Sequence, residues 1–320
     1  MDNLTHSLVG AEMGQAGLKR TTGLAMPALI IGANLPDVDA ACFFWLEGTE
    51  HLAFRRGITH GPPALVLLPL ILAGLLWAFD RWPTRRGTRP EGRLPVRFGW
   101  LYAMAFVGCL SHPFFDWLNV YGIRLLEPFS SQWFYGDTLF IIDPWLWALL
   151  IASVWWSRRR EKAGADWARA GQVGVGAVLA YVGVNGAITW LNYETRGTRT
   201  EPYPLAHIAA PVPFEFWRRE QIARLGDERW ISSDWDGTDF GYGYANSKAV
   251  QCKVRPFTVA LGEKTQLGGF LFWSRAPFAT RAPDGSVILY DARFYDPRVR
   301  ERFSVALPDV KCEPLPSSSP

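Results

Sequence analysis

Four apolar runs in this chain are each long enough to cross a lipid bilayer, and they limit its fold more than any other feature. They are residues 62–80, 98–118, 139–156 and 170–191. A helix needs about 20 apolar residues to span the hydrocarbon core. A fifth run, 24–46, is interrupted by Pro36, Asp37 and Asp39, and a sixth, 4–18, is short and semi-polar. We therefore expect about six membrane-embedded helices.

The sequence changes character after residue 192. Residues 268–295, "GGFLFWSRAPFATRAPDGSVILYDARFY", alternate apolar and polar side chains around a Pro-Asp-Gly turn, which indicates a β-hairpin. The mean hydropathy of +0.01 is also low for a membrane bundle alone. We predict a mainly α, polytopic membrane helical bundle over residues 1–192, then a β-rich soluble domain over 193–313 and a disordered tail over 314–320.

The distribution of basic residues sets the expected orientation. Loop 81–97 carries six arginines against one glutamate, loop 157–169 is also strongly basic, and Lys19 and Arg20 follow the first helix. By the positive-inside rule these three connections are cytoplasmic, which places the N-terminus and the C-terminal domain outside the cell membrane. The net charge of +3 is too small to indicate nucleic-acid binding.

The four cysteines fall into two groups. Cys42 and Cys109 lie in apolar segments, where we interpret them as small packing residues. Cys252 and Cys312 lie in the polar C-terminal part, where an extracytoplasmic location would allow a disulfide between them.

Histidine and aspartate residues recur near the outer ends of the predicted helices. Ionisable side chains inside membrane segments are costly and commonly functional. Carboxylate oxygen and imidazole nitrogen together suit a divalent metal, zinc first, with manganese or iron as alternatives. The charge count allows one ion or two. The candidate metal ligands are His6, Asp37, Asp39, His60, His112 and Asp116.

The spacing within three motifs supports this set. In "SHPFFD", His112 and Asp116 are four residues apart and share a helix face, although a hydrogen-bonded helix cap would use the same pair. In "NLPDVD", Pro36 breaks a helix so that the aspartates can turn inward, or form an Asx turn. In "RRGITHG", His60 follows a glycine and opens the next helix. Two further acids are candidate supporting residues of the site. Asp143 could equally cap a helix, and Glu12 could be a buried partner inside the bundle.

Residues 1–155 or so resemble the YdjM-type family of membrane-bound, metal-dependent hydrolases, described as inner-membrane proteins. The matching pieces are "THSLVG", "NLPDVD", "RRGITHG", "SHPFFDWLNVYGIRLLEPFS" and "DTLFIIDPW". The resemblance implies that the six candidate ligands bind metal and that the chain lies in the bacterial inner membrane. Two positions depart from the family pattern: Arg55 stands where the family usually has histidine, and Gly61 where it usually has serine.

The order His, Asp, His, His-x-x-x-Asp also resembles, more weakly, the zinc-dependent phospholipase C and P1 nuclease group. We expect a hydrolase in which a metal-activated water attacks a phosphoester or lipid-linked, anionic substrate at the outer face of the membrane. Asp39 or Asp37 would act as general base, and Arg55, Arg56 and Arg124 would hold the substrate anion. The alternatives are a non-catalytic metal-binding sensor or scaffold and a metal transporter; the apolar inner halves of the helices argue against transport. The expected partners are the lipid bilayer and the substrate, and the sequence leaves protein partners open.

Overall fold

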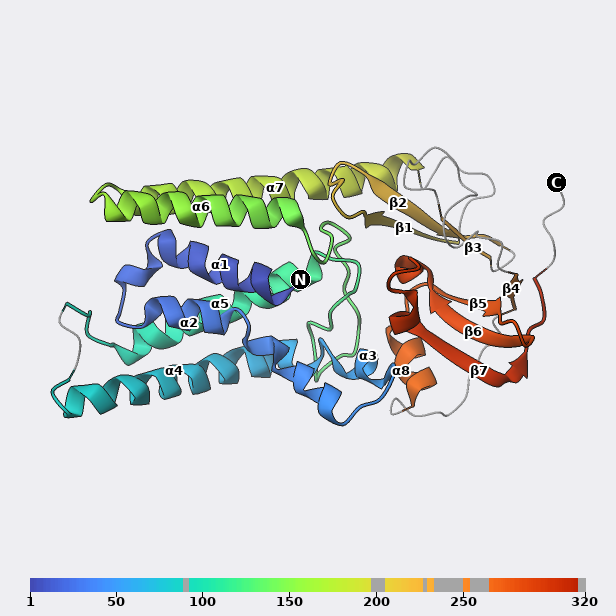
Figure 1. Cartoon of the computed structure of the whole chain (residues 1–320), viewed down its shortest axis with the longest axis horizontal. Helices are drawn as coiled ribbons and strands as arrows, with labels where there is room; N and C mark the ends of the chain where they lie inside the picture. Colours follow the sequence, from blue (N-terminus) through green and yellow to red (C-terminus); the bar gives the residue numbers. More distant parts are fainter. Residues whose placement is uncertain (89–91, 197–204, 227–228, 233–249, 254–264, 316–320) are drawn as a thin grey trace. The chain divides into compact units, whose positions relative to one another are not determined.

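The structure is a computed structural model that describes residues 1–88, 92–196, 205–226, 229–232, 250–253 and 265–315 (Figure 1). The chain forms two compact units. Unit 1 comprises residues 1–39 and 56–186, and unit 2 comprises residues 40–55 and 187–320. The boundary that we predicted after residue 192 falls inside one continuous helix, α7 (Trp167–Arg196).

Unit 1 is a bundle of helices that run in two opposite directions, so that the connections between them lie at its two ends. In Figure 1, α1, α4 and α6 run in one direction along the bundle, and α2, α5 and the start of α7 return. The connections that carry the basic loops 81–97 and 157–169 therefore share one end of unit 1. The elements are α1 (Asn3–Gln15), η1 (Leu18–Arg20), α2 (Ala25–Gly32), η2 (Leu35–Phe44, to residue 39), η3 (Ile58–His60), α4 (Pro62–Arg85), α5 (Phe98–Trp117), α6 (Pro144–Lys162) and α7 to residue 186.

Three helices among the described residues are long and apolar enough to cross a membrane, fewer than the six we expected. They are Pro62–Trp82, Phe98–Trp117 and Trp167–Thr195. A fourth span is added if α2 and η2, which are bent by 49° at their junction, are counted as one. The helix α1 has only 13 residues, and the apolar part of α6 stops before the basic run that starts at Arg158. The run that begins at residue 139 becomes helical only at Pro144, because Asp143 caps α6 by accepting hydrogen bonds from Trp145 N and Leu146 N.

Glycines allow the central helices of unit 1 to approach closely. A Cβ atom at Gly108 of α5 would lie 2.5 Å from the Leu29 carbonyl oxygen, and one at Gly32 of α2 would lie 2.6 Å from the Ala105 carbonyl oxygen. Gly10 packs α1 against the α2 backbone in the same way, since a Cβ there would lie 2.7 Å from the Leu29 carbonyl oxygen. Small residues at membrane helix interfaces permit such contact between backbones.

Unit 2 contains two antiparallel sheets, which confirms the prediction of a β-rich C-terminal region. The first sheet has the order β1 (Ala206–Pro211), β2 (Arg219–Arg224) and β3 (Trp230–Ser232). The second has the order β4 (Gln251–Cys252), β5 (Pro277–Arg281), β6 (Ser286–Asp291) and β7 (Ser304–Lys311). The predicted hairpin is β5–β6, with Pro277 paired to Asp291 across the Pro-Asp-Gly turn.

One part of the predicted hairpin is wrong, because residues 268–273 belong to a helix, α8 (Gln266–Trp273). The Thr265 hydroxyl caps this helix by accepting a hydrogen bond from Gly268 N. Gly269 then lets α8 lie against α3 (Glu50–Phe54): a Cβ there would be 2.8 Å from the Thr49 carbonyl oxygen. The cap and this close contact outweigh the apolar–polar alternation.

Cys252 and Cys312 form a disulfide, as the sequence suggested, while Cys42 and Cys109 are buried. The disulfide joins β4 to the segment that follows β7, closing a separation of 60 residues. Residues 316–320 of the predicted tail lie outside the described part of the chain; before them, Pro314 forms an isolated bridge with Cys252.

A buried ion pair fixes the end of β6 in unit 2. Asp291 accepts hydrogen bonds from Arg293 Nε at 2.8 Å and from Ser274 Oγ at 2.6 Å. Burial by itself would raise the pKa of Asp291, but the Arg293 guanidinium and these hydrogen bonds hold that pKa below its usual value. The carboxylate therefore stabilises the fold in its ionised form.

The variant Gly108→Ala should unfold at a lower temperature than the native protein, since its methyl group must displace the α2 backbone; we expect a loss of about 1–3 kcal/mol. Gly99→Ala on the same helix is the matched control, because nothing lies within 4 Å of its Cβ position. That control should be neutral or slightly stabilising, since alanine favours helix. Thermal unfolding in detergent measures both variants, and equal effects would contradict the close packing.

The variant Asp291→Asn should weaken unit 2 by about 3–5 kcal/mol at pH 7, because it leaves Arg293 buried without its charge partner. The folded pKa of Asp291 is depressed, so the stabilisation is present above the unfolded value of about 3.9 and is lost as pH falls through the folded value. The difference from the native protein should thus shrink at pH 3. Hydrogen exchange of β6 peptides in the full chain measures this, with exposed Asp309→Asn as the control.

Candidate metal centre

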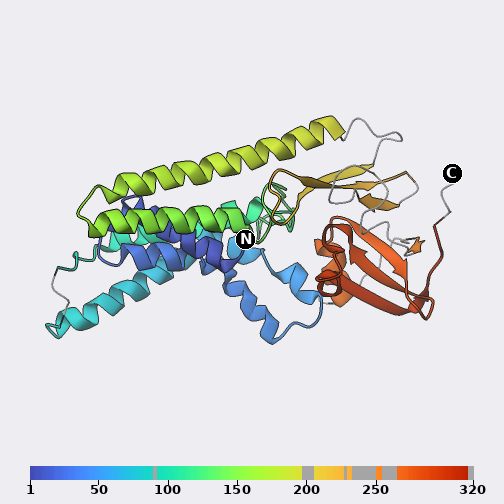
Figure 2. The same cartoon turned by 45° about the horizontal axis from the view of Figure 1, so that its top comes forward.

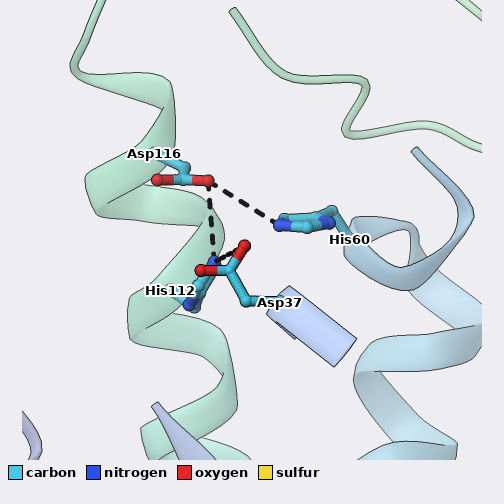
Figure 3. A group of neighbouring side chains, drawn as sticks. All are labelled: Asp37, His60, His112 and Asp116. Atoms are coloured by element: carbon cyan, nitrogen blue, oxygen red, sulfur yellow. Dashed lines mark ion pairs between the residues drawn. The ribbon is translucent and has the colours of Figure 1, made fainter. Parts of the chain in front are cut away.

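Four side chains from three separate elements of unit 1 meet at one point (Figure 3). Asp37 comes from η2, His60 from η3, and His112 and Asp116 from the last turns of α5. Each offers one ligand atom, and these atoms all lie within 4.8 Å of one another. The structure thus brings together four of the six candidate ligands, which we call the metal group.

The pair on α5 is oriented by the end of α2. The side chains of His112 and Asp116 lie on one helix face, with Nε2 and Oδ2 3.5 Å apart. His112 Nδ1 lies 2.7 Å from the carbonyl oxygen of Ala33, the residue that caps the C-terminus of α2. A terminal helix carbonyl needs a donor, so Nδ1 carries the proton and donates it there. Nε2 is then left as the acceptor nitrogen, aimed at the group and buried with no hydrogen-bond donor among the described residues.

The residues Asp37 and His60 approach this pair from irregular segments. Helix α2 ends at Gly32, and the ten-residue 3₁₀ helix η2, which contains Pro36, brings Asp37 Oδ1 to 3.8 Å from His112 Nε2. His60 ends the turn η3, with Nε2 3.7 Å from Asp116 Oδ2. Gly61 is required beside it, because a Cβ at that position would lie 1.9 Å from the Glu127 carbonyl oxygen. This contact explains why the chain has no serine there.

The spacing of the ligand atoms fits a divalent ion. Ligand atoms around tetrahedral zinc lie about 3.3 Å apart when metal–ligand bonds are about 2.0–2.1 Å. The three imidazole–carboxylate separations in the metal group are 3.5, 3.7 and 3.8 Å. Small side-chain rotations would therefore close the group around an ion. Such an ion would also bind the buried acceptor nitrogen of His112, Nε2.

His6 extends the metal group on one side. Its ring stacks on that of His112 with centroids 3.7 Å apart, and its Nε2 lies 3.4 Å from Asp116 Oδ1. Neither ring nitrogen of His6 has a hydrogen-bond partner among the described residues. Asp116 therefore has Oδ1 toward His6, where the Met1 amino group also contacts it, and Oδ2 toward His60 and His112.

The aspartate Asp39 lies beside the metal group and holds the loop that carries His60. Its Oδ2 accepts hydrogen bonds from Arg56 N at 2.8 Å and from Thr59 Oγ1 at 3.2 Å, and lies 3.7 Å from His60 Nδ1. Arg56 has a left-handed backbone with φ of 54°, which is uncommon for a residue with a side chain. The bond to Asp39 supports this conformation.

The left-handed backbone turns the Arg56 side chain into the site. Its Nε lies 2.9 Å from Asp116 Oδ2, and Nη2 lies 3.1 Å from Oδ1, so the guanidinium makes a bidentate contact with the carboxylate. Nη1 donates to Asn119 Oδ1 at 3.0 Å. This ion pair is the feature that the sequence analysis missed, together with the role of Asn119. Asn119 follows the end of α5, three positions after Asp116, and its place beside Arg56 depends on how the chain turns there.

The other candidate residues lie apart from the metal group. Arg124 pairs with Glu127 at 2.8 Å, and the Arg55 guanidinium lies over the Phe43 ring in unit 2. Asp143 caps α6 and accepts hydrogen bonds from the Tyr181 hydroxyl. Glu12 is buried between helices and accepts a hydrogen bond from Ser153 Oγ at 2.7 Å.

The fold and the metal group together define a polytopic helical membrane protein with a buried histidine–aspartate cluster. The chain belongs to the YdjM inner membrane protein family, which matches it over residues 1–191. It is also similar to the uncharacterized protein YfhP of Bacillus subtilis (strain 168), with 24% identity over 190 residues. That match covers 57% of this chain and 51% of the relative, so the chain spans about half the length of YfhP. No solved structure matches the chain.

The variant His112→Ala should lose divalent metal, because it removes the acceptor nitrogen that is aimed at the ion. We expect the zinc affinity of the purified protein to fall by more than about a hundredfold, and that of Asp39→Asn, which only supports His60, by about 10–100-fold. Metal analysis after dialysis and competition with a zinc indicator measure both. His51→Ala, a histidine outside the group in unit 2, should retain native stoichiometry. Equal zinc content in all variants would contradict the site.

Proposed function

We propose that this protein is a membrane-bound, metal-dependent hydrolase of a phosphoester or lipid-linked substrate with an anionic group. The observation that carries the proposal is the convergence of two imidazoles and two carboxylates in a buried cluster at one end of the bundle. A divalent ion held there would supply a bound water of lowered pKa and a Lewis acid for the scissile bond. Zinc fits the nitrogen and oxygen ligands best, with manganese or iron as alternatives.

The number of ions is linked to Asp116. Its two oxygens face different imidazoles, with Oδ1 near His6 and Oδ2 near His60 and His112. A carboxylate with this arrangement can serve one ion on each side. The Arg56 guanidinium balances the charge of Asp116 and fixes its plane. The metal group would hold one ion, and His6 with Asp116 would supply donors toward a second.

The two aspartates of "NLPDVD" take different roles in this proposal. Asp39 already accepts hydrogen bonds from the Arg56 backbone and the Thr59 hydroxyl, so we assign it to positioning His60. Asp37 is the less buried of the two, with 9% of its side chain exposed against 1% for Asp39. We therefore assign Asp37 as the metal ligand that also faces the substrate and could accept the proton of the attacking water.

Two observations support a site on the outer side of the inner membrane. The basic loops belong to the end of unit 1 opposite the metal group, because α4 begins just after His60 and α5 ends with Asp116 (Figure 1). By the positive-inside rule that basic end is cytoplasmic. The Cys252–Cys312 disulfide is typical of an oxidising compartment, which is consistent with an extracytoplasmic unit 2.

The substrate class is inferred from the surroundings of the metal group. The site lies at the ends of apolar helices, a level that a lipid-linked molecule reaches from within the bilayer. Phe129, which is 78% exposed, lies two residues after Glu127, whose carbonyl oxygen packs against Gly61 beside His60. Because Arg56 and Arg124 are paired with Asp116 and Glu127, a substrate anion would compete with these acids or contact the metal itself.

The zinc- or manganese-loaded protein should hydrolyse at least one member of a panel of phosphodiesters and phospholipids. His112→Ala and Asp116→Asn should each lower kcat/KM by more than about a thousandfold, since they remove metal ligands, and a chelator should abolish turnover reversibly. His207→Ala in unit 2 is the matched control and should keep native activity. Metal binding without turnover on any substrate would favour a sensor or scaffold, and metal flux in proteoliposomes would favour a transporter.

A further inference from the structure

A groove of about 500 Å³ runs between α1 and α6 in unit 1. One of its lining residues, Leu8, comes from α1, and the others all come from α6. Those on α6 are separated by three, one, three, one and three positions, so they form a single stripe along one helix face. The α6 residues are Ile151, Val154, Trp155, Arg158, Arg159 and Lys162.

The character of this stripe changes along the helix. Its first half is apolar, with Ile151 51% exposed and Trp155 60% exposed. Its second half consists of Arg158, Arg159 and Lys162. At 1.5 Å per residue, about 16 Å of helix separates Ile151 from Lys162. The groove therefore has an apolar half and a cationic half, arranged end to end.

The cationic half is available to an external anion. Arg158, Arg159 and Lys162 form no ion pair with any described residue, whereas the neighbouring Glu161 pairs with Lys19 at 2.5 Å. Arg159 lies over the Trp155 ring, 5.4 Å from its centroid, at the junction of the two halves. Three unpaired cations beside an exposed apolar wall match a molecule with an anionic head and an apolar tail.

We propose that this groove binds an anionic phospholipid. Arg158, Arg159 and Lys162 hold the headgroup phosphate, and the acyl chain lies along Leu8, Ile151 and Trp155. A free phosphate would leave the apolar half uncovered, and a zwitterionic lipid would leave excess positive charge. The site is separate from the metal group, because it includes the C-terminal end of α6, which Figures 1 and 2 place at the far end of the bundle from the start of α6 and the end of α5. The proposal therefore goes beyond the hydrolase function and does not depend on it.

Lipid binding here would also stabilise α1. Leu8 is two residues from His6 on the same short helix, and α1 packs against α6. A lipid that contacts both helices joins them more firmly.

Native mass spectrometry of the full chain, titrated with phosphatidylglycerol or phosphatidylcholine of the same chain length, tests the site. The native protein should bind phosphatidylglycerol more tightly than phosphatidylcholine. The affinity of the variant Arg158→Gln/Arg159→Gln/Lys162→Gln for phosphatidylglycerol should be lower by more than about tenfold. The variant Arg81→Gln/Arg85→Gln/Arg86→Gln is the matched control: it removes the same charge from the other basic loop at the same end and should bind normally. Unchanged elution and melting temperature of the lipid-free variants verify folding.

A second variant tests the apolar half without changing charge. Ile151→Trp adds bulk to the exposed wall of the groove and should also weaken phosphatidylglycerol retention, while millimolar inorganic phosphate should leave it unchanged. Equal retention by the native protein and the α6 triple variant would overturn the proposal. An equal loss in the control would also overturn it, by indicating diffuse charge attraction, and displacement by inorganic phosphate would assign the cations to a free anion.

Discussion

A carboxylate buried at the end of an apolar helix needs positive charge close to both of its oxygens, and Asp116 is such a group. It is fully buried in unit 1, where an unpaired charge would be too costly to retain. The Arg56 guanidinium contacts both of its oxygens, and three imidazole rings surround it. The left-handed backbone at Arg56 directs the guanidinium toward Asp116. Asp39 stabilises that backbone by a hydrogen bond and also positions the loop that carries His60.

Helix packing and site geometry are coupled through α2 and α5. The glycines at positions 32 and 108 let the two backbones touch, and this contact brings the carbonyl of Ala33 to the Nδ1 atom of His112. Which nitrogen of the histidine faces the cluster is thus decided by how closely two membrane helices pack. A change at an interface residue that touches no ligand would alter the chemistry of the site.

Much of the site could be predicted because it depends on local spacing. The four-residue interval of His112 and Asp116, the helix break at Pro36 and the short turn before His60 are all visible in the sequence. The direction of Arg56 was not, because a left-handed residue is selected by its tertiary partner Asp39 and not by its own preference. The same limit applies to Asp37 and Asp39. Their side chains lie two positions apart in η2 and point in different directions, and only the packed structure separates the cluster member from its neighbour.

The fold was predicted less completely for related reasons. The β5–β6 hairpin follows from its turn residues, and the long apolar runs became helices. Residues 268–273 formed a helix because Thr265 caps them locally and because Gly269 fits against α3. The second contact depends on residues more than two hundred positions earlier. The helices α1 and α6 belong to the bundle although neither is long and apolar enough to qualify as a span on its own. Hydropathy measures the apolar content of a segment and not how its helix packs against its neighbours.

Residues 40–55 belong to unit 2, although they lie in the sequence between two segments of unit 1. This segment is flanked on both sides by unit 1, and its Thr49 hydroxyl donates to the Gln266 carbonyl oxygen at 2.6 Å. The polypeptide therefore passes from one unit to the other three times, and no single cut separates them. An expression fragment that starts at residue 193 would lack α3, the helix on which α8 packs, and a fragment that stops at residue 192 would leave α3 without its cover.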